Sequence, residues 1–456
     1  MAIHYLYTEY LNKDFLTLYK IYLPIKKIPY RLFVCTVNLI VLLHAQLELG
    51  SSIKHSSINK SSKTLMHIND NLGNGFYSWL KMDFGSMVYV NQMCMSTDQE
   101  NMVRGSKKKV FGIYGFSNLG YIQFKKEDKH LKHLVTVGRN YIDHGFGKYS
   151  KLLISKWSRP FDQIRWQAQY KGITANMIGI QLDQIGDINR YLSIHTIDFT
   201  ISENLTLSFG ESAIYSGKNR GIELQYFNPT LFWVPIRENQ MDNQANSFLY
   251  NGIKYSKNKF SMWYEFLLDD YQIDREIKEP TTYGLTFGLE KDNNENFISN
   301  YWFEYTMVSN RTYQTQSFNN QEDYLHRGFP IGHQGGNDFN QIIFSLSSKS
   351  KKFFSKNINY NLKVTNLRDG ANGLDTPWDT PWLDENGNNI QNFSENSPTE
   401  PINSILEGEL YATLHNKKSY LDVGLFFQNK SLNTENSSNW TIYFRYEIYL
   451  GKKIKY

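Results

Sequence analysis

Residues 440–450 read WTIYFRYEIYL and alternate between two kinds of side chain over their whole length. One set of alternate positions is apolar or aromatic and consists of Trp440, Ile442, Phe444, Tyr446, Ile448 and Leu450. The other set carries Thr441, Tyr443, Arg445, Glu447 and Tyr449. Because successive side chains of a strand point to opposite faces, this pattern predicts a β-strand with one apolar face and one charged face.

The same period of two recurs in shorter pieces along the chain. The clearest are 406–414 and 421–428, and further candidates are 135–141, 166–170, 178–182, 197–201, 205–210, 260–268, 283–289, 301–307, 342–346 and 360–364. A strand that crosses a membrane within a barrel needs about 9–11 residues. The 411 residues from Gln46 onward would supply about 18 such strands at about 23 residues per strand and connection. The sequence therefore predicts an all-β fold, a large antiparallel transmembrane β-barrel of the outer membrane with long extracellular loops.

A soluble β-sandwich also alternates and is the competing interpretation. Aromatic residues make up 15% of the chain, which favours the barrel because barrels carry aromatic girdles on their outer face. Arg445 and Glu447 would not fit a dry sandwich core, but a solvated sheet face would accept them. The chain also ends at an aromatic residue, Tyr456, as bacterial outer-membrane barrels commonly do.

The first 45 residues have the features of a leader. Lys26, Lys27 and Arg31 precede the apolar run LFVCTVNLIVLL at 32–43, and Ala45 follows as a small residue. This order predicts a secretory signal peptide cleaved between Ala45 and Gln46, and a run of this length is too short for a membrane-spanning helix. The domain prediction is an N-terminal extension plus signal peptide over 1–45 and a single barrel domain over 46–456.

Charge and cysteine content limit the partners. The formal net charge of +5 falls to +2 after removal of the first 45 residues, which contain five basic and two acidic side chains. This balance gives no electrostatic footprint for nucleic acid. Cys94 would be the one cysteine left after cleavage, so we expect no internal disulfide and read Cys94 as a small buried hydrophobe.

Motifs for catalysis and cofactor binding are missing from the sequence: it has no G-x-S-x-G elbow, H-E-x-x-H zinc site, phosphate-binding loop or dinucleotide fingerprint. His326, His333 and Asp338 lie close in sequence but lack a recognised ligand spacing. The acidic stretch at 384–388 resembles a calcium loop but lacks its glycine position and final glutamate. We expect no enzyme activity, no cofactor and no metal.

Charged and aromatic residues are dense in 209–238, where Glu211, Arg220 and Glu223 stand among tyrosine, phenylalanine and tryptophan. Unpaired charges are costly in lipid, so we expect these groups to line a polar lumen or a sugar-binding surface. They could instead satisfy one another and plug the barrel. The longest loop, 366–401, holds a tandem Asp-Thr-Pro-Trp at 375–382. Its tryptophans could stack on sugar rings or pack the loop onto itself.

Three stretches resemble the Wzi family of outer-membrane capsule assembly proteins, in the order found in that family. They are VTVGRNYIDHGFGKYSKLLIS at 135–155, the FGES and IELQYFNP block within 209–229, and YLHRGFPIGHQGGND at 324–338. The resemblance implies a large, closed or narrowed barrel that holds surface polysaccharide at the cell as a lectin-like, non-catalytic attachment protein. The N-terminal extension and the lack of a clear helical plug sequence depart from the family.

The expected partners are surface polysaccharide and outer-membrane lipid, and the expected state is a monomer in the outer membrane. A nutrient channel and a component of surface motility or adhesion are the alternatives. Candidate residues for polysaccharide binding or for a polar network in the lumen are Glu211, Arg220, Glu223, Tyr226, Asn228, Arg139, His333, Asn337, Asp338, Trp378 and Trp382.

Overall fold

The computed structural model describes most of the chain from Gln46 onward. The described residues are 46–56, 75–96, 112–228, 232–233, 245–271, 279–293, 296–315, 321–354, 356–390, 393–416, 418–432 and 435–455. The predicted signal peptide, the predicted cleavage point and the terminal Tyr456 lie outside these residues. No helix within the described residues is long and apolar enough to cross a membrane.

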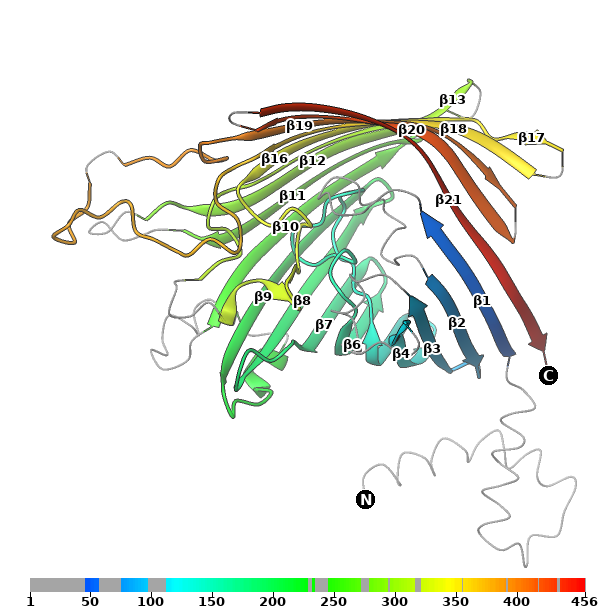
Figure 1. Cartoon of the computed structure of the whole chain (residues 1–456). Helices are drawn as coiled ribbons and strands as arrows, with labels where there is room; N and C mark the ends of the chain where they lie inside the picture. The colour runs from blue at the N-terminus through cyan, green and yellow to red at the C-terminus, as the bar shows by residue number, and fades with distance from the viewer. Residues whose placement is uncertain are drawn as a thin grey trace, which may run out of the picture.

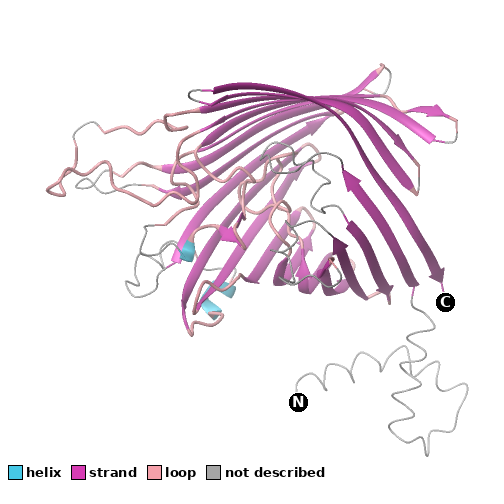
Figure 2. Ribbon diagram, in the orientation of Figure 1, coloured by secondary structure: helices cyan, strands magenta, loops and turns pink. Residues whose placement is uncertain are grey.

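The strands form a closed antiparallel barrel of 18 strands, as predicted, because the first strand pairs with both the second and the last (Figures 1 and 2). The short β17 pairs only with β18 and extends the β16 position. The strands are β1 (Gln46–Ser56), β2 (Gly75–Asp83), β3 (Met87–Ser96), β4 (Tyr114–Glu127), β5 (Leu131–Asn140), β6 (Phe161–Tyr170), β7 (Ile173–Gln181), β8 (Ile188–Ser202), β9 (Leu205–Lys218), β10 (Ala245–Lys257), β11 (Phe260–Asp270), β12 (Thr282–Asp292), β13 (Ile298–Val308), β16 (Phe339–Ser348), β17 (Lys351–Phe353), β18 (Lys356–Asp369), β19 (Asn403–His415), β20 (Ser419–Leu432) and β21 (Glu435–Lys455).

Connections of different length separate the two edges of the barrel. The turns that follow β2, β4, β6, β8 and β10 are tight and lie on the edge where β1 begins and β21 ends. The opposite edge carries the long connections, among them 141–160, 219–244, 309–338 and 370–402. In barrels of this type the long loops are extracellular and the short turns periplasmic, so we orient the molecule accordingly.

The two faces of the wall are inverted relative to those of a soluble protein. On β21, Ile442 and Phe444 are exposed on the outside, whereas Tyr443, Arg445 and Glu447 are buried on the inside. The other predicted strand pieces also fall in strands, although Tyr141 and Leu182 lie one residue beyond them. An apolar outside and a charged inside are what lipid on one side and a polar lumen on the other require.

Two long connections fold into the barrel and build a hydrophobic core there. Segment 141–160 and segment 309–338, which contains the small hairpin β14 (Leu325–His326) and β15 (Phe329–Pro330), meet inward-facing side chains of β6 to β16. This core includes Leu152, Leu153, Tyr313, Tyr324 and Phe339, each almost fully buried. In Figure 1 the cyan segment that follows β5 runs through the interior of the ring. The lumen is therefore partly filled by its own loops.

The inverted faces predict opposite responses to a new charge at neighbouring positions of β21. The change Phe444→Arg places a cation in lipid near the middle of the strand and should destabilise the barrel by about 2–4 kcal/mol. The change Thr441→Arg points the same cation into the lumen and should cost far less. Unfolding by urea in lipid vesicles measures both, and equal losses would contradict the assignment of faces.

Candidate functional site

The inward-folded segment 141–160 is held by a buried carboxylate on the barrel wall. Glu304, on the inner face of β13, accepts backbone N–H groups from Lys148 at 2.6 Å, Tyr149 at 3.1 Å and Ser150 at 2.7 Å. The indole Nε1–H of Trp263 on β11 donates to the same carboxylate at 3.0 Å. Burying a charge is costly unless it is well hydrogen-bonded, and these four donors meet that need.

A second carboxylate supports the start of the same turn. Glu265 on β11 accepts the backbone N–H of Gly147 at 2.6 Å and that of Phe146. The turn depends on glycine: Gly145 has φ +128°, and a Cβ at Gly147 would lie 1.9 Å from the carbonyl oxygen of Ser150. The Gly-x-Gly of this stretch therefore lets five consecutive N–H groups converge on two acids.

Segment 309–338 covers the other side of segment 141–160. The hydroxyl of Tyr313 donates to the carbonyl of Leu152 at 2.6 Å, and that of Tyr324 donates to the carbonyl of Leu153 at 2.8 Å. The Tyr313 and Tyr324 rings stack at 5.4 Å. The two segments therefore form one packed unit inside the barrel, called here the loop plug (residues 141–160, 309–315 and 321–338).

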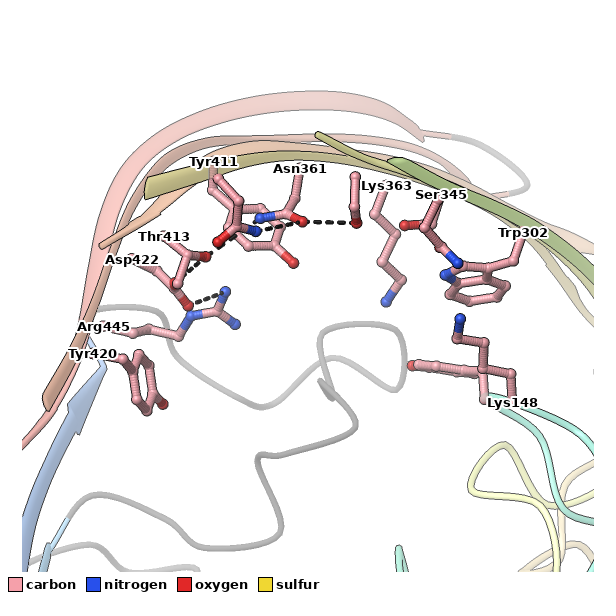
Figure 3. A pocket seen from close by; sticks show the side chains of 14 residues that line it. Lys148, Trp302, Ser345, Asn361, Lys363, Tyr411, Thr413, Tyr420, Asp422 and Arg445 are labelled. Carbon is pink, nitrogen blue, oxygen red and sulfur yellow. Dashed lines mark hydrogen bonds and ion pairs between the residues drawn. The ribbon is translucent and has the colours of Figure 1, made fainter. Parts of the chain in front are cut away.

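Beside the loop plug, the lumen keeps a polar pocket of about 410 Å³ against the inner faces of β13, β16 and β18 to β21 (Figure 3). A chain of hydrogen bonds crosses its wall, strand by strand. Ser347 donates to Asn361 at 2.8 Å, Asn361 to Thr413 at 3.3 Å, and Thr413 to Asp422 at 2.7 Å. Arg445 completes the chain with an ion pair to Asp422 at 3.1 Å.

Aromatic rings and cations alternate around the same pocket. Lys148 Nζ lies 5.4 Å from the Trp302 ring, and Lys363 Nζ lies 4.5 Å from the Tyr149 ring. The guanidinium of Arg445 lies 5.4 Å from the ring of Tyr411. Figure 3 shows the Lys363 amine pointing from the wall into the cavity. Flat apolar rings beside fixed donors and acceptors can bind a molecule that has both apolar ring faces and many hydroxyl groups, as sugars do.

Glu211 does not face the lumen, one of the two locations that the sequence interpretation left open. Its neighbour on the same face of β9 is Phe209, which is 51% exposed on the outside of the barrel, so Glu211 also points outward. It is nevertheless only 1% exposed, because Trp233 covers it and donates its backbone N–H at 2.8 Å. Trp233 is part of a layer of chain on the outside of the wall, called here the outer layer (residues 219–228 and 232–233). Tyr226 belongs to this layer and stacks on Tyr215 with a distance of 4.3 Å between the ring centroids.

Arg220, Glu223 and Asn228 also lie with this outer layer. Arg220 and Glu223 form an ion pair of 2.6 Å, and Arg220 also donates to the carbonyl of Ser216 at 2.8 Å. Glu223 and Asn228 cap the two ends of the 3-10 helix η2 (Leu224–Phe227). The charged groups of these residues satisfy one another, as one of the alternatives from the sequence predicts. They do so on the outer wall, however, and not inside the barrel.

Arg139 lies at the long-loop rim, away from the outer layer and the lumen pocket. It forms a two-pronged pair with Asp162 on β6, with N–O distances of 2.9 and 2.6 Å. This pair ties β5 to β6 where segment 141–160 leaves the wall. The position suits a structural tie between the two strands.

His333, Asn337 and Asp338 belong to the loop plug. His333 Nε2 lies 3.1 Å from the hydroxyl of Ser150, and Asn337 donates to Gln314 at 3.0 Å. Asp338, with φ +57°, accepts the backbone N–H groups of Asn372 at 3.0 Å and Thr399 at 2.9 Å. Asp338 thus fixes the 370–402 loop to the plug, and all three side chains are buried.

Trp378 and Trp382 flank one arginine of the plug. The Arg311 guanidinium lies 5.1 Å from the Trp378 ring and 5.0 Å from the Trp382 ring, and it pairs with Asp379 at 2.6 Å and Glu395 at 3.0 Å. Trp382 is only 1% exposed. These contacts favour the interpretation in which the tryptophans pack the loop onto the protein.

His326 is separated from His333 and has its own partners. Its Nδ1 lies 3.2 Å from Asp183, which also accepts the backbone N–H of Arg327 at 2.8 Å and pairs with Arg190 at 3.2 Å. Burial alone would raise the pKa of Asp183, but these hydrogen bonds and the Arg190 charge lower it to about 2. Among the described residues, no group of His, Cys, Asp and Glu could hold a metal ion.

The pKa values of two acids in the loop plug, Glu322 and Asp323, shift in the opposite direction. Burial raises the pKa of Glu322 to about 7, although Ser216 donates to it through both its hydroxyl and its backbone N–H, each at 3.1 Å. Burial likewise raises the pKa of Asp323 to about 6, against hydrogen bonds from Thr315. Both carboxyls lie where segment 309–338 meets the rim of the wall.

Comparisons with known proteins support the fold. The structure is similar to Wzi from Escherichia coli, with a TM-score of 0.60 and 13% identity, covering 94% of this chain and 90% of that one. That protein is described as an outer-membrane protein involved in group 1 capsule assembly and as a carbohydrate-binding β-barrel. Pseudomonas aeruginosa OccD3 and OprD match with TM-scores of 0.47 and 0.44 and identities of 10% and 8%. They cover 90% of this chain, and the chain covers 91% and 94% of them.

No protein-family model and no curated protein matches the sequence. The similarity to Wzi therefore supports the fold, an antiparallel β-barrel of the outer-membrane type.

Sequence reasoning missed the lumen pocket and the two acids that hold the loop plug. A signal for them existed, since Trp302 and Glu304 occupy the inward positions between the outward Tyr301, Phe303 and Tyr305. The alternation places such residues in the lumen. It does not identify the loop that folds back to meet them.

Removing the Glu304 carboxylate should loosen the loop plug. Glu304→Ala leaves three backbone N–H groups without their acceptor, so segment 141–160 should open and expose Lys148 and Lys151 to trypsin. Limited proteolysis of the folded protein in detergent should show cleavage there at least tenfold faster than in the wild type. Glu290→Ala is the matched control, because Glu290 contacts the Lys148 side chain and not the backbone. Equal protection in both variants would contradict the role of Glu304.

The raised pKa of Glu322 predicts a pH-dependent difference between wild type and Glu322→Gln. Between about pH 4.5 and 7 the folded carboxyl holds a proton that the unfolded one releases, so the stability contributed by Glu322 falls as pH rises. At pH 8 the variant should be more stable, by on the order of 3 kcal/mol at about 1.36 kcal/mol per pKa unit. At pH 4 the difference in the free energy of unfolding between wild type and variant should disappear. Urea unfolding at both pH values measures it, and a gap independent of pH would refute the shift.

Proposed function

We propose that this protein is an outer-membrane barrel that binds a surface polysaccharide and helps to hold it at the cell, without catalysing a reaction. The observation that carries the proposal is the lumen pocket, in which a continuous polar chain on the wall lies beside aromatic ring faces. A saccharide presents hydroxyl groups at its edges and C–H groups on its ring faces, so this lining matches its chemistry.

The similarity to Wzi supports the same class of ligand, since that relative is a carbohydrate-binding barrel involved in capsule assembly. Attachment to capsular or exopolysaccharide is therefore our first assignment, and a contribution to adhesion or surface motility would be a consequence of the same binding. We expect the polymer to be recognised by contacts inside the barrel, with the outer layer around Glu211 serving another purpose.

A nutrient channel is disfavoured by the loop plug. The described loops fill the lumen beside β6 to β13 with a tight hydrophobic core, and hydrogen bonds to Glu265 and Glu304 fix them there. A freely conducting channel needs a continuous aqueous path. The purified protein in planar bilayers should conduct poorly, whereas steady solute flux would favour transport.

The test in cells is a deletion strain assayed for polysaccharide in the cell-bound and shed fractions. Loss of the protein should move polymer from the cells to the medium while the total amount stays constant. Complementation with Arg220→Ala should restore retention, because Arg220 lies on the outer wall. An unchanged distribution in the deletion strain would reject the attachment function.

The pocket itself is tested by two truncations. Trp302→Ala and Tyr411→Ala each remove a ring face and should weaken binding of the extracted surface polysaccharide about three- to tenfold, corresponding to about 1 kcal/mol. Trp440→Ala removes an exposed ring on the outer face of β21 and is the control. Binding to purified, folded protein can be followed by calorimetry. Equal affinities in all three variants would exclude the lumen pocket as the binding site.

A further inference from the structure

A layer of chain covers part of the outer wall, where other parts of the barrel meet lipid directly. This outer shelf (residues 219–228 and 232–233) packs on outward-facing side chains of β7 to β10. They include Met177, Tyr191, Ala213, Tyr215 and Ala245. The fit is close, because a Cβ at Gly179 would lie 2.0 Å from the ring of Phe227. The shelf therefore stands out from the barrel on its membrane side, in the half nearer the long loops.

A backbone hydrogen bond to a wall carboxylate fastens the end of the shelf to the wall. His195 on β8 and Glu211 on β9 are register partners, with His195 Nε2 3.3 Å from a Glu211 carboxylate oxygen. The backbone N–H of Trp233 donates to Glu211 at 2.8 Å, and the Trp233 ring lies 4.2 Å from the His195 ring. Because unshielded charge is unfavourable in lipid, the Trp233 cap explains how this pair persists on an outward face.

Directly below the fastened end, on the side of the short turns, the wall is hollowed by a groove of about 530 Å³. Its lining is almost entirely apolar and includes Ile197, Phe199, Phe209, Leu249, Phe266 and Leu268. Phe232 of the shelf, which is 72% exposed, forms its upper lip. This volume lies within the range of sites that enclose small ligands, about 300–1,000 Å³.

The surroundings of the groove define its occupant. Toward the short turns it continues into the exposed apolar band of the wall, through Ile201 and Ile253. Toward the long loops it is closed by the shelf. A ligand must therefore be apolar and enter from the membrane on the periplasmic side, where the leaflet consists of phospholipid. We propose that the groove binds one acyl chain of a periplasmic-leaflet phospholipid.

A second copy of the barrel fits the groove less well. A neighbouring barrel presents a convex wall, which would rest on the projecting shelf and on exposed side chains such as Leu224 before it reached the recess. A single flexible acyl chain can lie under Phe232 and along the rings of Phe209 and Phe266. The binding gains apolar contact area that bulk lipid, in constant exchange, would cover only loosely.

Filling the groove tests the proposal. Leu249→Trp places a large ring in the recess, whereas Leu406→Trp makes the same change at an outward position of β19; the two leucines are 39% and 42% exposed. After extraction and extensive detergent washing, native mass spectrometry should find one phospholipid on the wild type and on Leu406→Trp, and none on Leu249→Trp. Heat-modifiable electrophoretic mobility confirms that each variant is folded. Equal retention by both variants, or no lipid on the wild type, would overturn the proposal.

A labelling experiment on the unaltered protein is independent of variant folding. Phosphatidylethanolamine with a diazirine in its acyl chain is incorporated into outer-membrane vesicles and photolysed, and labelled peptides are mapped. Labelling at Phe209, Phe232 and Leu249 should exceed labelling at Leu406 at least fivefold. Uniform labelling of all outward positions would reject a specific site. Protein–protein cross-links from Phe232→Cys, or preferential labelling by a lipid A probe, would replace the phospholipid with another occupant.

Discussion

The structure depends on one constraint: every backbone polar group in a membrane-spanning wall must find its partner within the protein. The pairing of β1 with β21 meets it, because it leaves no open edge on either terminal strand. Once the sheet is closed, each strand has one face toward lipid and one toward the lumen. The alternation of apolar and charged residues on β21, and on every other strand predicted from the sequence, follows from that geometry. The fold is therefore encoded in local patterns, although closure itself is a long-range event.

Buried carboxylates attach loops to both sides of this wall and share one chemistry. Glu304 and Glu265 accept backbone N–H groups from segment 141–160 inside the barrel, and Glu211 accepts one from Trp233 outside it. Asp338 does the same between two loops. A buried carboxyl group that accepts several backbone N–H groups holds a chain in a defined path, because each hydrogen bond is directional. The position of a loop then depends on a few wall residues together with the loop's own glycines and buried side chains.

The sequence predicts the strands of the wall far better than the loops and the pocket that are attached to the wall. The strands around 283–289, 301–307 and 440–450 were identifiable, with their outward faces, from period-two alternation alone. The position of Glu211 was also contained in that pattern, since it continues the outward series of Leu207 and Phe209. The general rule against charge in lipid led to the lumen instead. That rule fails at Glu211 because Trp233 covers the carboxylate on the outer face. Trp233 lies 22 residues further along the chain, and no local pattern reveals this contact. The lumen pocket was missed for a related reason: its lining comes from six strands and a loop, each contributing one to three side chains.

Under the two proposals, the two faces of the barrel suit different ligands for physical reasons. Inside, fixed donors and acceptors such as Asn361 and Thr413 already hydrogen-bond one another, so a saccharide would meet a pre-arranged surface and little ordering would be required on binding. Outside, the groove under the shelf exposes little polar surface, although His195, Glu211 and Asn251 contribute to its lining, so it would discriminate mainly by the shape and length of a chain. A rigid wall stands between them, and on β9 the inward Ser208 and the outward Phe209 are adjacent residues. A ligand on one face can therefore influence the other chiefly through the loops that both faces anchor. The connection between Ser216, Glu322 and Arg220 at the rim is the place where the loop plug and the outer shelf meet.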